Sequence, residues 1–238
     1  MKVLSGIPIL VVVLLLWPRH ADPLPGFPRT ILWAWERPEN LDFIDPHTTG
    51  VAFLARTVFL RDGNVSVKPR LNPLRYTPGA TLIAVVRVDS DRSVLPPIAL
   101  AAEAIAAAGT TPGVRALQVD FDATLSQRVF YRDVLHQVRA SLPHDLPLSM
   151  TALASWCEAD HWIDGLPVAE AVPMLFRMGP EEQSPSSFRP ELCQTSAGVS
   201  LDEPMRVPAA VSRIYVFNPR PWNRADFRNM ISEVGRWH

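Results

Sequence analysis

Eight short apolar runs recur along this chain, and their number and spacing restrict the fold more than any other feature. Most are nearly continuous stretches of apolar residues, as expected for parallel strands that are covered on both faces. No change in composition marks a domain linker between them, so we expect a single domain over residues 31–238. The runs are Ile31–Trp35, Val51–Phe59, Thr81–Val88, Ala116–Phe121, Leu148–Ala154, Ala171–Arg177, Gly198–Leu201 and Arg213–Phe217.

The segments between the runs differ in length and in predicted structure. Asp62-Gly63 is a typical turn between two strand-like flanks and predicts a hairpin that extends the second run. Eight strands alternating with helices predict an α/β fold, a small (β/α)8 TIM-type barrel in which several helices are shortened or missing. An open doubly wound sheet is the alternative, but no glycine-rich phosphate loop follows the first run. Helices are expected at Leu95–Ala108, at Ser126–Ser141 with Ser126 as its N-cap, and at Ala225–Arg236 after Asn223.

The N-terminus resembles a secretory leader. Lys2 precedes an apolar run from Ile7 to Trp17, which is shorter than the roughly 20 residues needed to span a bilayer. We therefore expect a signal peptide over residues 1–21, a Pro-rich spacer over residues 22–30, and export to the periplasm or the extracellular space. Arg19 stands where a cleavage site requires a small residue, so an uncleaved N-terminal membrane anchor is the alternative.

The two cysteines, Cys157 and Cys193, fit an oxidising compartment. We expect them to form one disulfide, because free thiols are a liability outside the cell. The alternative is two half-buried free thiols. Cys157 follows one predicted strand and Cys193 precedes another, which places them at opposite ends of a regular sheet unless the intervening loop returns.

Composition and motifs exclude several classes of function. A net charge of −1 gives no electrostatic footprint for nucleic acid. The six histidines show no HxH, HxxxH or HExxH spacing, so no metal site is expected, and no motif indicates a cofactor. No GxSxG nucleophile elbow is present. The sequence leaves the oligomeric state open.

Two aspartates stand two residues apart at the end of the run ALQVDFDA. Because strand side chains alternate, Gln118, Asp120 and Asp122 point to one face, whereas Leu117, Val119 and Phe121 point to the other. Like charges placed side by side in a buried site force one carboxyl to keep its proton near neutral pH. Such a pair predicts general acid/base chemistry, and the alternative is a pair that is solvated or neutralised by arginines.

Further carboxylates follow other predicted strands, and a barrel gathers the C-terminal strand ends at one mouth. We expect Asp122 to be the general acid and Asp120 the neighbour that tunes it. Glu203 or Glu36 is then the base or nucleophile across the cleft.

Five of the six tryptophans outside the leader lie in or just after these strand ends, namely Trp33, Trp35, Trp156, Trp162 and Trp222. Indole faces pack against sugar rings, so a carboxylate pocket rimmed by tryptophan predicts a carbohydrate site. The alternative sends one of Trp33 and Trp35 outward against helices as ordinary core, and gives Arg177 a structural role as the counter-ion that holds Asp120 or Asp122 ionised. The expected substrate-binding residues are Trp35, Trp156, Arg177, Asp202, Asn218 and Trp222.

Several strings resemble one bacterial family: WAWERPE, GVAFLA, LIAVVRVD, LQVDFDA, LPLSMTALASWC, PVAEAVPMLFRMG, GVSLDEP and IYVFNPRPW. The family is the domain-of-unknown-function 3142 family, and the resemblance runs from about Leu32 to Trp222. It implies an exported bacterial protein with a barrel like those of glycoside hydrolases and no assigned reaction. A looser similarity is to family 18 chitinases, whose fourth strand carries alternate carboxylates ending in a catalytic glutamic acid. Gln118, Asp120 and Asp122 occupy those positions here.

Three hypotheses follow. The first is a glycoside hydrolase that acts on a cell-envelope or extracellular polysaccharide or oligosaccharide. The second is a non-catalytic glycan-binding or envelope-assembly barrel. The third is a metal-dependent hydrolase or deacetylase that uses Asp120, Asp122 and His161, for which the ligands are few.

Overall fold

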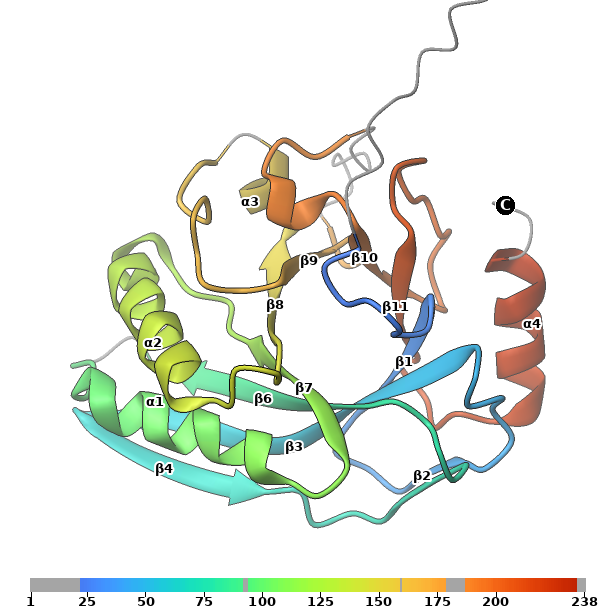
Figure 1. Ribbon diagram of the computed structural model, residues 1–238, viewed down its shortest axis with the longest axis horizontal. Helices are drawn as coiled ribbons and strands as arrows, with labels where there is room; N and C mark the ends of the chain where they lie inside the picture. The colour runs from blue at the N-terminus through green and yellow to red at the C-terminus, as the bar shows by residue number, and fades with distance from the viewer. Residues whose placement is uncertain (1–21, 92–93, 159, 179–186, 235–238) are drawn as a thin grey trace, which may run out of the picture.

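Eight parallel strands close into a barrel in the computed structural model, which describes residues 22–91, 94–158, 160–178 and 187–234 (Figure 1). Each strand is hydrogen-bonded to the next, and β11 pairs with β1 to complete the ring. The predicted (β/α)8 barrel is confirmed, with one strand for each apolar run. The strands in ring order are β1 (Thr30–Ala34), β3 (Thr49–Arg61), β6 (Leu82–Ser90), β7 (Val114–Asp120), β8 (Leu148–Leu153), β9 (Glu170–Met174), β10 (Ser196–Ser200) and β11 (Arg213–Phe217).

The predicted hairpin is also confirmed. β4 (Asn64–Pro69) pairs antiparallel with the second half of β3, and Asp62 and Gly63 form the turn with φ values of 48° and 75°. Positive φ at both central residues gives a turn whose twist matches that of the flanking strands. A separate two-stranded sheet, of β2 (Glu39–Leu41) and β5 (Leu74–Tyr76), was not expected from the sequence.

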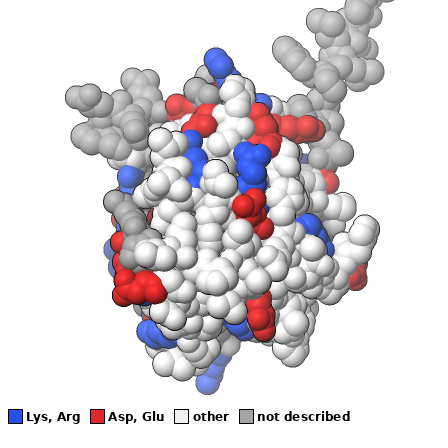
Figure 2. Space-filling model, turned by 90° about the vertical axis from the view of Figure 1, so that its left-hand side faces the viewer, with Lys and Arg blue, Asp and Glu red and all other residues white. Residues whose placement is uncertain are grey.

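Helices cover the barrel incompletely. α1 (Ile98–Ala106) and α2 (Arg128–Ser141) lie side by side on one flank, and α4 (Arg224–Val234) lies at the opposite side (Figure 1). Figure 2 shows that the flank of α1 and α2 carries few charges over much of its area, with acidic and basic side chains gathered in its upper part. The remaining helical pieces are α3 (Ala154–Glu158) and three 3-10 turns, η1 (Ala107–Thr110), η2 (Leu125–Gln127) and η3 (Glu191–Cys193).

The helix ends show one correct and one wrong expectation. Asn223 caps α4, because its Oδ1 accepts hydrogen bonds from the backbone N–H groups of Ala225 and Asp226. Ser126 does not begin the second helix. The N–H of Thr124 instead donates to Oε1 of Gln127 at 3.0 Å, which starts a 3-10 turn ahead of α2.

The barrel has an inner and an outer apolar layer. Side chains that alternate along each strand fill the barrel interior, whereas Leu117, Val119 and Phe121 pack outward as predicted. Trp33 is the largest interior side chain, and a Cβ at position 198 would lie 2.8 Å from its ring, so Gly198 leaves the space that the indole fills. The inner layer consists of Ile31, Trp33, Ala52, Ile83, Val85, Ala116, Val172 and Tyr215.

The expected spacer packs against the N-terminal end of the barrel. Leu24 is fully buried. Arg213 donates hydrogen bonds to the Asp22 carboxylate at 2.9 Å and 3.0 Å, and to the carbonyl oxygens of Leu24 and Pro28. Residues 22–29 therefore close this end of the barrel.

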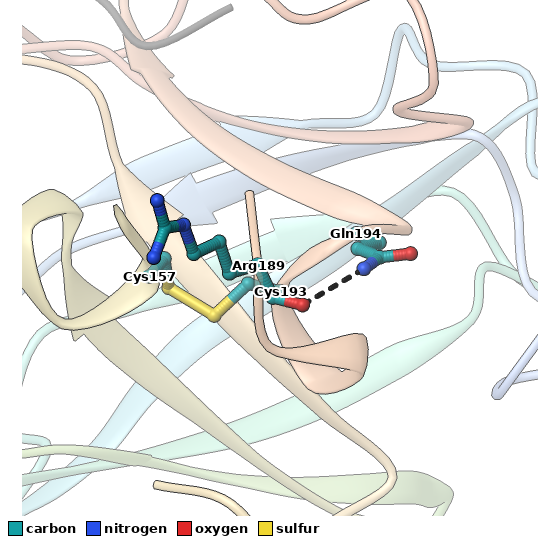
Figure 3. The surroundings of a disulfide bond; sticks show 4 residues. All are labelled: Cys157, Arg189, Cys193 and Gln194. Atoms are coloured by element: carbon teal, nitrogen blue, oxygen red, sulfur yellow. Dashed lines mark hydrogen bonds between the residues drawn. A yellow bond between two sulfur atoms is a disulfide. The ribbon is translucent and has the colours of Figure 1, made fainter. Parts of the chain in front are cut away.

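The predicted disulfide is confirmed between Cys157 in α3 and Cys193 in η3 (Figure 3). Their Cα atoms lie 5.8 Å apart, and both residues are fully buried. The chain between β9 and β10 returns to α3, where the N–H of Arg189 donates to the carbonyl of Cys157 at 3.0 Å. Gln194 in turn donates to the carbonyl of Arg189 (Figure 3). This return brings together two cysteines that a regular sheet would separate.

The predicted leader lies outside the described residues. Within the residues that are described, no helix has the length and apolar character needed to cross a bilayer.

Candidate functional site

A pocket of about 620 Å³ lies at the C-terminal ends of the barrel strands. This is the end at which barrels of this type place their active sites. The lining combines three carboxylates, two arginines and four aromatic rings. These residues are Asp120, Asp122 and Glu158; Arg87 and Arg177; and Trp33, Trp35, Phe176 and Phe217.

Asp120 is the last residue of β7 and is half-buried in the pocket. Its Oδ1 accepts a hydrogen bond of 2.8 Å from the hydroxyl of Thr151 on β8. Burial and the neighbouring charge of Asp122 raise the pKa of the Asp120 carboxyl to about 6, against the opposing effects of Thr151 and Arg87. The carboxyl is therefore half-protonated in slightly acidic solution.

Asp122 follows two residues later and is exposed in the pocket. The two aspartates thus share one face with Gln118, as the strand alternation predicted. Arg87, the neighbour of Asp120 in the register of β6 and β7, lowers the pKa of Asp120 without offsetting burial, and neither Arg87 nor Arg177 forms an ion pair with either aspartate. The counter-ion role that the sequence offered to Arg177 is therefore not supported.

Glu158 is a pocket carboxylate that the strand-end pattern missed. It ends α3, a five-residue helix that begins directly after β8, and its side chain is exposed in the pocket. Its neighbour Cys157 anchors this helix through the disulfide. The available signal was its position four residues after the predicted strand Leu148–Ala154.

Glu36 and Glu203 do not line the pocket. Oε1 of Glu36 accepts hydrogen bonds from the side chain of Asn72 and from the backbone N–H groups of Leu71 and Asn72. Burial raises the pKa of the Glu36 carboxyl, but these hydrogen bonds outweigh it and the net pKa is lowered. The Glu203 carboxylate accepts hydrogen bonds from the N–H of Arg177 at 3.1 Å and 3.2 Å. Both carboxylates hold backbone in place.

The side chains of Asp202 and Asn218 also form hydrogen bonds within the protein instead of lining the pocket. The Asp202 carboxylate accepts a hydrogen bond from the Ser200 hydroxyl, and Asp202 does not line the pocket. Asn218 is fully buried, and its side chain donates to Asp226 while accepting from the N–H of Arg220. Of the carboxylates expected at this mouth, namely Glu36, Asp120, Asp122, Asp202 and Glu203, only Asp120 and Asp122 line the pocket.

Among the predicted sugar-binding tryptophans, Trp35 lines the pocket and Trp156 and Trp222 do not. Trp156 is 2% exposed and packs edge to face against Trp162. Trp222 is 4% exposed, and its indole N–H donates to the carbonyl of Trp33 at 3.0 Å. Trp33 itself is buried in the inner layer and forms the floor of the pocket, so neither member of the Trp33–Trp35 pair packs outward against helices as the alternative predicted, because residues two apart on a strand point to the same face.

A chain of hydrogen bonds runs below this floor along the barrel axis. The indole N–H of Trp33 donates to Gln118 at 2.9 Å, and the Gln118 amide donates to Ser149 at 3.1 Å. Ser149 donates in turn to Oε1 of Glu170 at 3.2 Å. Each of these side chains is buried, so the chain satisfies polar groups that water cannot reach.

Glu170 is the carboxylate at the closed end of the barrel, and sequence reasoning missed it. The hydroxyl of Tyr215 donates to Oε1 at 2.5 Å, the hydroxyl of Ser196 donates to Oε2, and Arg213 pairs with Oε2 at 3.5 Å. Burial, with the charge and hydrogen bond of Glu170, raises the pKa of the Tyr215 hydroxyl well above its ordinary value. The available signal was a lone Glu directly before an apolar run, which by itself is not distinctive.

Tyr131 on α2 lies behind the aspartate pair and packs edge to face on Phe121. Its hydroxyl is buried and has no hydrogen-bond partner among the described residues. Burial and the charges of Asp120 and Asp122 raise the pKa of this hydroxyl well above its ordinary value.

The metal-site hypothesis is not supported by the geometry. Among the described residues, no group of three or more His, Cys, Asp or Glu side chains is placed to hold a metal ion. His161 does not line the pocket, and its Nδ1 lies 3.0 Å from Oδ2 of Asp164.

The fold and the pocket define a barrel with a carboxylate-containing site at its C-terminal end. No family model matches the chain, and neither does any curated protein. A solved structure with a similar fold is the spore cortex-lytic enzyme SleL of Bacillus cereus, with 18% sequence identity and a TM-score of 0.45. The match covers 74% of this chain and 52% of the other, so this chain spans about half the length of SleL. This similarity is too low to indicate a reaction.

Proposed function

We propose that this protein is an exported glycoside hydrolase that acts on a cell-envelope or extracellular polysaccharide, and that it belongs to the domain-of-unknown-function 3142 family. The observation that carries the reaction is Asp120, a half-buried carboxyl with a pKa of about 6 in an open pocket beside Trp35. A carboxyl that holds a proton near the working pH is what protonation of a glycosidic oxygen requires.

The raised pKa favours Asp120, rather than Asp122, as the proton donor. Asp122 is then the charged neighbour that keeps this proton in place. Donation from Asp120 to the glycosidic oxygen lets the bond to the anomeric carbon break and the alcohol leave. Glu158 replaces Glu203 and Glu36 as the carboxylate that activates water or attacks the anomeric carbon.

The test is release of reducing ends from a panel of envelope and extracellular polysaccharide fragments by the chain from Asp22 onward. Asp120→Asn should reduce kcat by about 10²- to 10⁴-fold. Asp122→Asn removes the like charge, so the pKa of Asp120 falls and the alkaline limb of the pH–rate profile moves to lower pH. Glu36→Gln is the matched control, because its amide oxygen still accepts the hydrogen bonds around Asn72.

Two outcomes would contradict this assignment. Loss of activity in Asp122→Asn with Asp120→Asn still active would make Asp122 the acid. Absence of release from every fragment, with tryptophan fluorescence still changing on glycan addition, would support the second candidate function.

That second candidate is a non-catalytic glycan-binding barrel. The observation in its favour is that Trp35, half-buried beside Phe217, lines the pocket, since a sugar can pack there without any reaction. In a binder, Trp35→Ala should weaken affinity far more than Asp120→Asn does.

A further inference from the structure

One side of the pocket is built from two arginines and the aromatic rings that they cover. The guanidinium carbon of Arg87 lies 5.7 Å from the Trp35 ring centre, and that of Arg177 lies 5.6 Å from the Phe217 ring centre. The two rings meet edge to face at 6.2 Å. These four side chains form a continuous surface, the arginine–aromatic wall. Its rings come from the ends of β1 and β11, across the barrel from the acids that follow β7 and β8.

The two cations of the wall differ in their surroundings. Arg87 lies close enough to Asp120 to lower the pKa of that carboxyl. Both arginines are exposed, and neither guanidinium forms an ion pair with a carboxylate of the described residues, but Arg177 is not among the groups that shift the pKa of Asp120. Arg177 is thus the cation of the wall that is exposed and not engaged with the aspartate pair.

The backbone of Arg177 is held in an uncommon conformation. Its φ is 54°, in the left-handed region that a side chain other than glycine rarely adopts, and both oxygens of Glu203 accept its N–H. Such conformations persist where the surroundings enforce them, and they are frequent at ligand sites. Glu203 therefore holds Arg177 at the pocket edge instead of taking part in catalysis.

We infer that the pocket binds an acidic glycan, with a carboxylate of the sugar paired to the Arg177 guanidinium and the sugar ring packed against Trp35. The Arg177 guanidinium lies over the Phe217 ring without a carboxylate partner among the described residues, and the fork of N–H donors of a guanidinium matches the two oxygens of a carboxylate. This inference rests on the proposed carbohydrate function and names its substrate class.

The test compares each acidic glycan with its own neutral form. Oligosaccharides of hyaluronan, alginate and polygalacturonate are titrated into Asp120→Asn protein beside their carboxyl-reduced counterparts, with calorimetry and tryptophan fluorescence as readouts. At least one acidic form should bind, and its reduced form should bind about ten- to a hundredfold more weakly. Added salt should narrow this difference, because it screens an exposed ion pair.

Two arginine variants locate the interaction. Arg177→Gln should abolish the preference for the acidic form, whereas Arg228→Gln, an exposed change on α4 away from the pocket, should leave it intact. Equal binding of acidic and reduced forms, failure of every acidic form to bind, or an unchanged preference in Arg177→Gln would each overturn the inference.

Different results would contradict the inference about acidic glycans and the proposed hydrolysis. Hydrolysis of a neutral glycan with no preference for acidic forms would reject the inference and keep the enzyme. Preferential binding of an acidic glycan by the active chain with no release of reducing ends would keep the inference and reject the enzyme.

Discussion

A carboxylate at the closed end of this barrel and one at the open end differ in how fully hydrogen bonds and charges satisfy them. At the closed end, Glu170 is fully buried and receives hydrogen bonds or an ion pair from four side chains, Ser149, Ser196, Arg213 and Tyr215. At the open end, Asp120 is only half-buried and accepts one side-chain hydrogen bond from the described residues, that of Thr151, and its neighbours are Arg87 and the like-charged Asp122.

This difference distinguishes a structural carboxylate from a reactive one. A buried charge that is paired and hydrogen-bonded stays ionised and holds strands together, whereas an under-satisfied one holds a proton that it can transfer. Removing the first should cost stability, and removing the second should cost activity while relieving strain.

The largest expected effect on stability comes from Glu170→Ala. It leaves the buried Arg213 guanidinium without its interior partner, so the free energy of unfolding should fall by about 3–5 kcal/mol. Chemical denaturation measures this change. Glu103→Ala, on the exposed face of α1, is the control and should change stability by less than about 0.5 kcal/mol. Equal effects of the two changes would remove the contrast between the barrel ends.

The disulfide should stabilise the open end, where it anchors α3 and the adjoining Glu158. The two cysteines are 36 residues apart, and closing a loop of this length restricts the unfolded chain by about 3–4 kcal/mol. The double change of Cys157 and Cys193 to Ala should lower the denaturation midpoint accordingly, and reductant should lower that of the wild type. An unchanged midpoint in both cases would show that the bond contributes nothing to stability.

Asp120→Asn should act in the opposite direction to Glu170→Ala. The Asp120 pKa rises from 3.8 to about 6 on folding, so the folded protein binds more protons than the unfolded chain between these values. The free energy of unfolding of the wild type therefore falls as the pH rises from about 4 to 6. The fall is at most about 3 kcal/mol, and it is smaller where solvent screens the half-buried carboxylate.

The Asn variant has no carboxyl to titrate at this position. Its free energy of unfolding should therefore equal that of the wild type below about pH 4 and exceed it by the full amount at pH 7. Denaturation curves at these two pH values measure it. A variant that is less stable than the wild type at pH 7 would show that Asp120 is a structural carboxylate like Glu170.

The smallest effect is expected from a matched pair of tyrosines. Tyr215→Phe removes a hydrogen bond to Glu170 and should cost about 1–3 kcal/mol. Tyr131→Phe removes a buried hydroxyl without a partner among the described residues, so stability should stay within about 0.5 kcal/mol or rise. Similar losses in both variants would mean that the Tyr131 hydroxyl is also satisfied.

The sequence by itself was enough for the barrel, because nearly continuous apolar runs at regular intervals leave few other ways to bury eight strands. It also placed Asp120 and Asp122 correctly, since strand alternation assigns side chains to one face without reference to the rest of the chain. The disulfide followed from the number of cysteines and the expected compartment.

The tertiary structure alone decided which residues from different strands meet. Glu36, Glu203 and Trp222 all follow strands, yet the side chain of each forms hydrogen bonds with residues distant in sequence. Glu158, in contrast, enters the pocket through a short helix. A local pattern specifies the face on which a side chain lies and the end of a strand that it follows. The hydrogen bonds and packing that occupy that side chain depend on long-range contacts, which no local pattern contains.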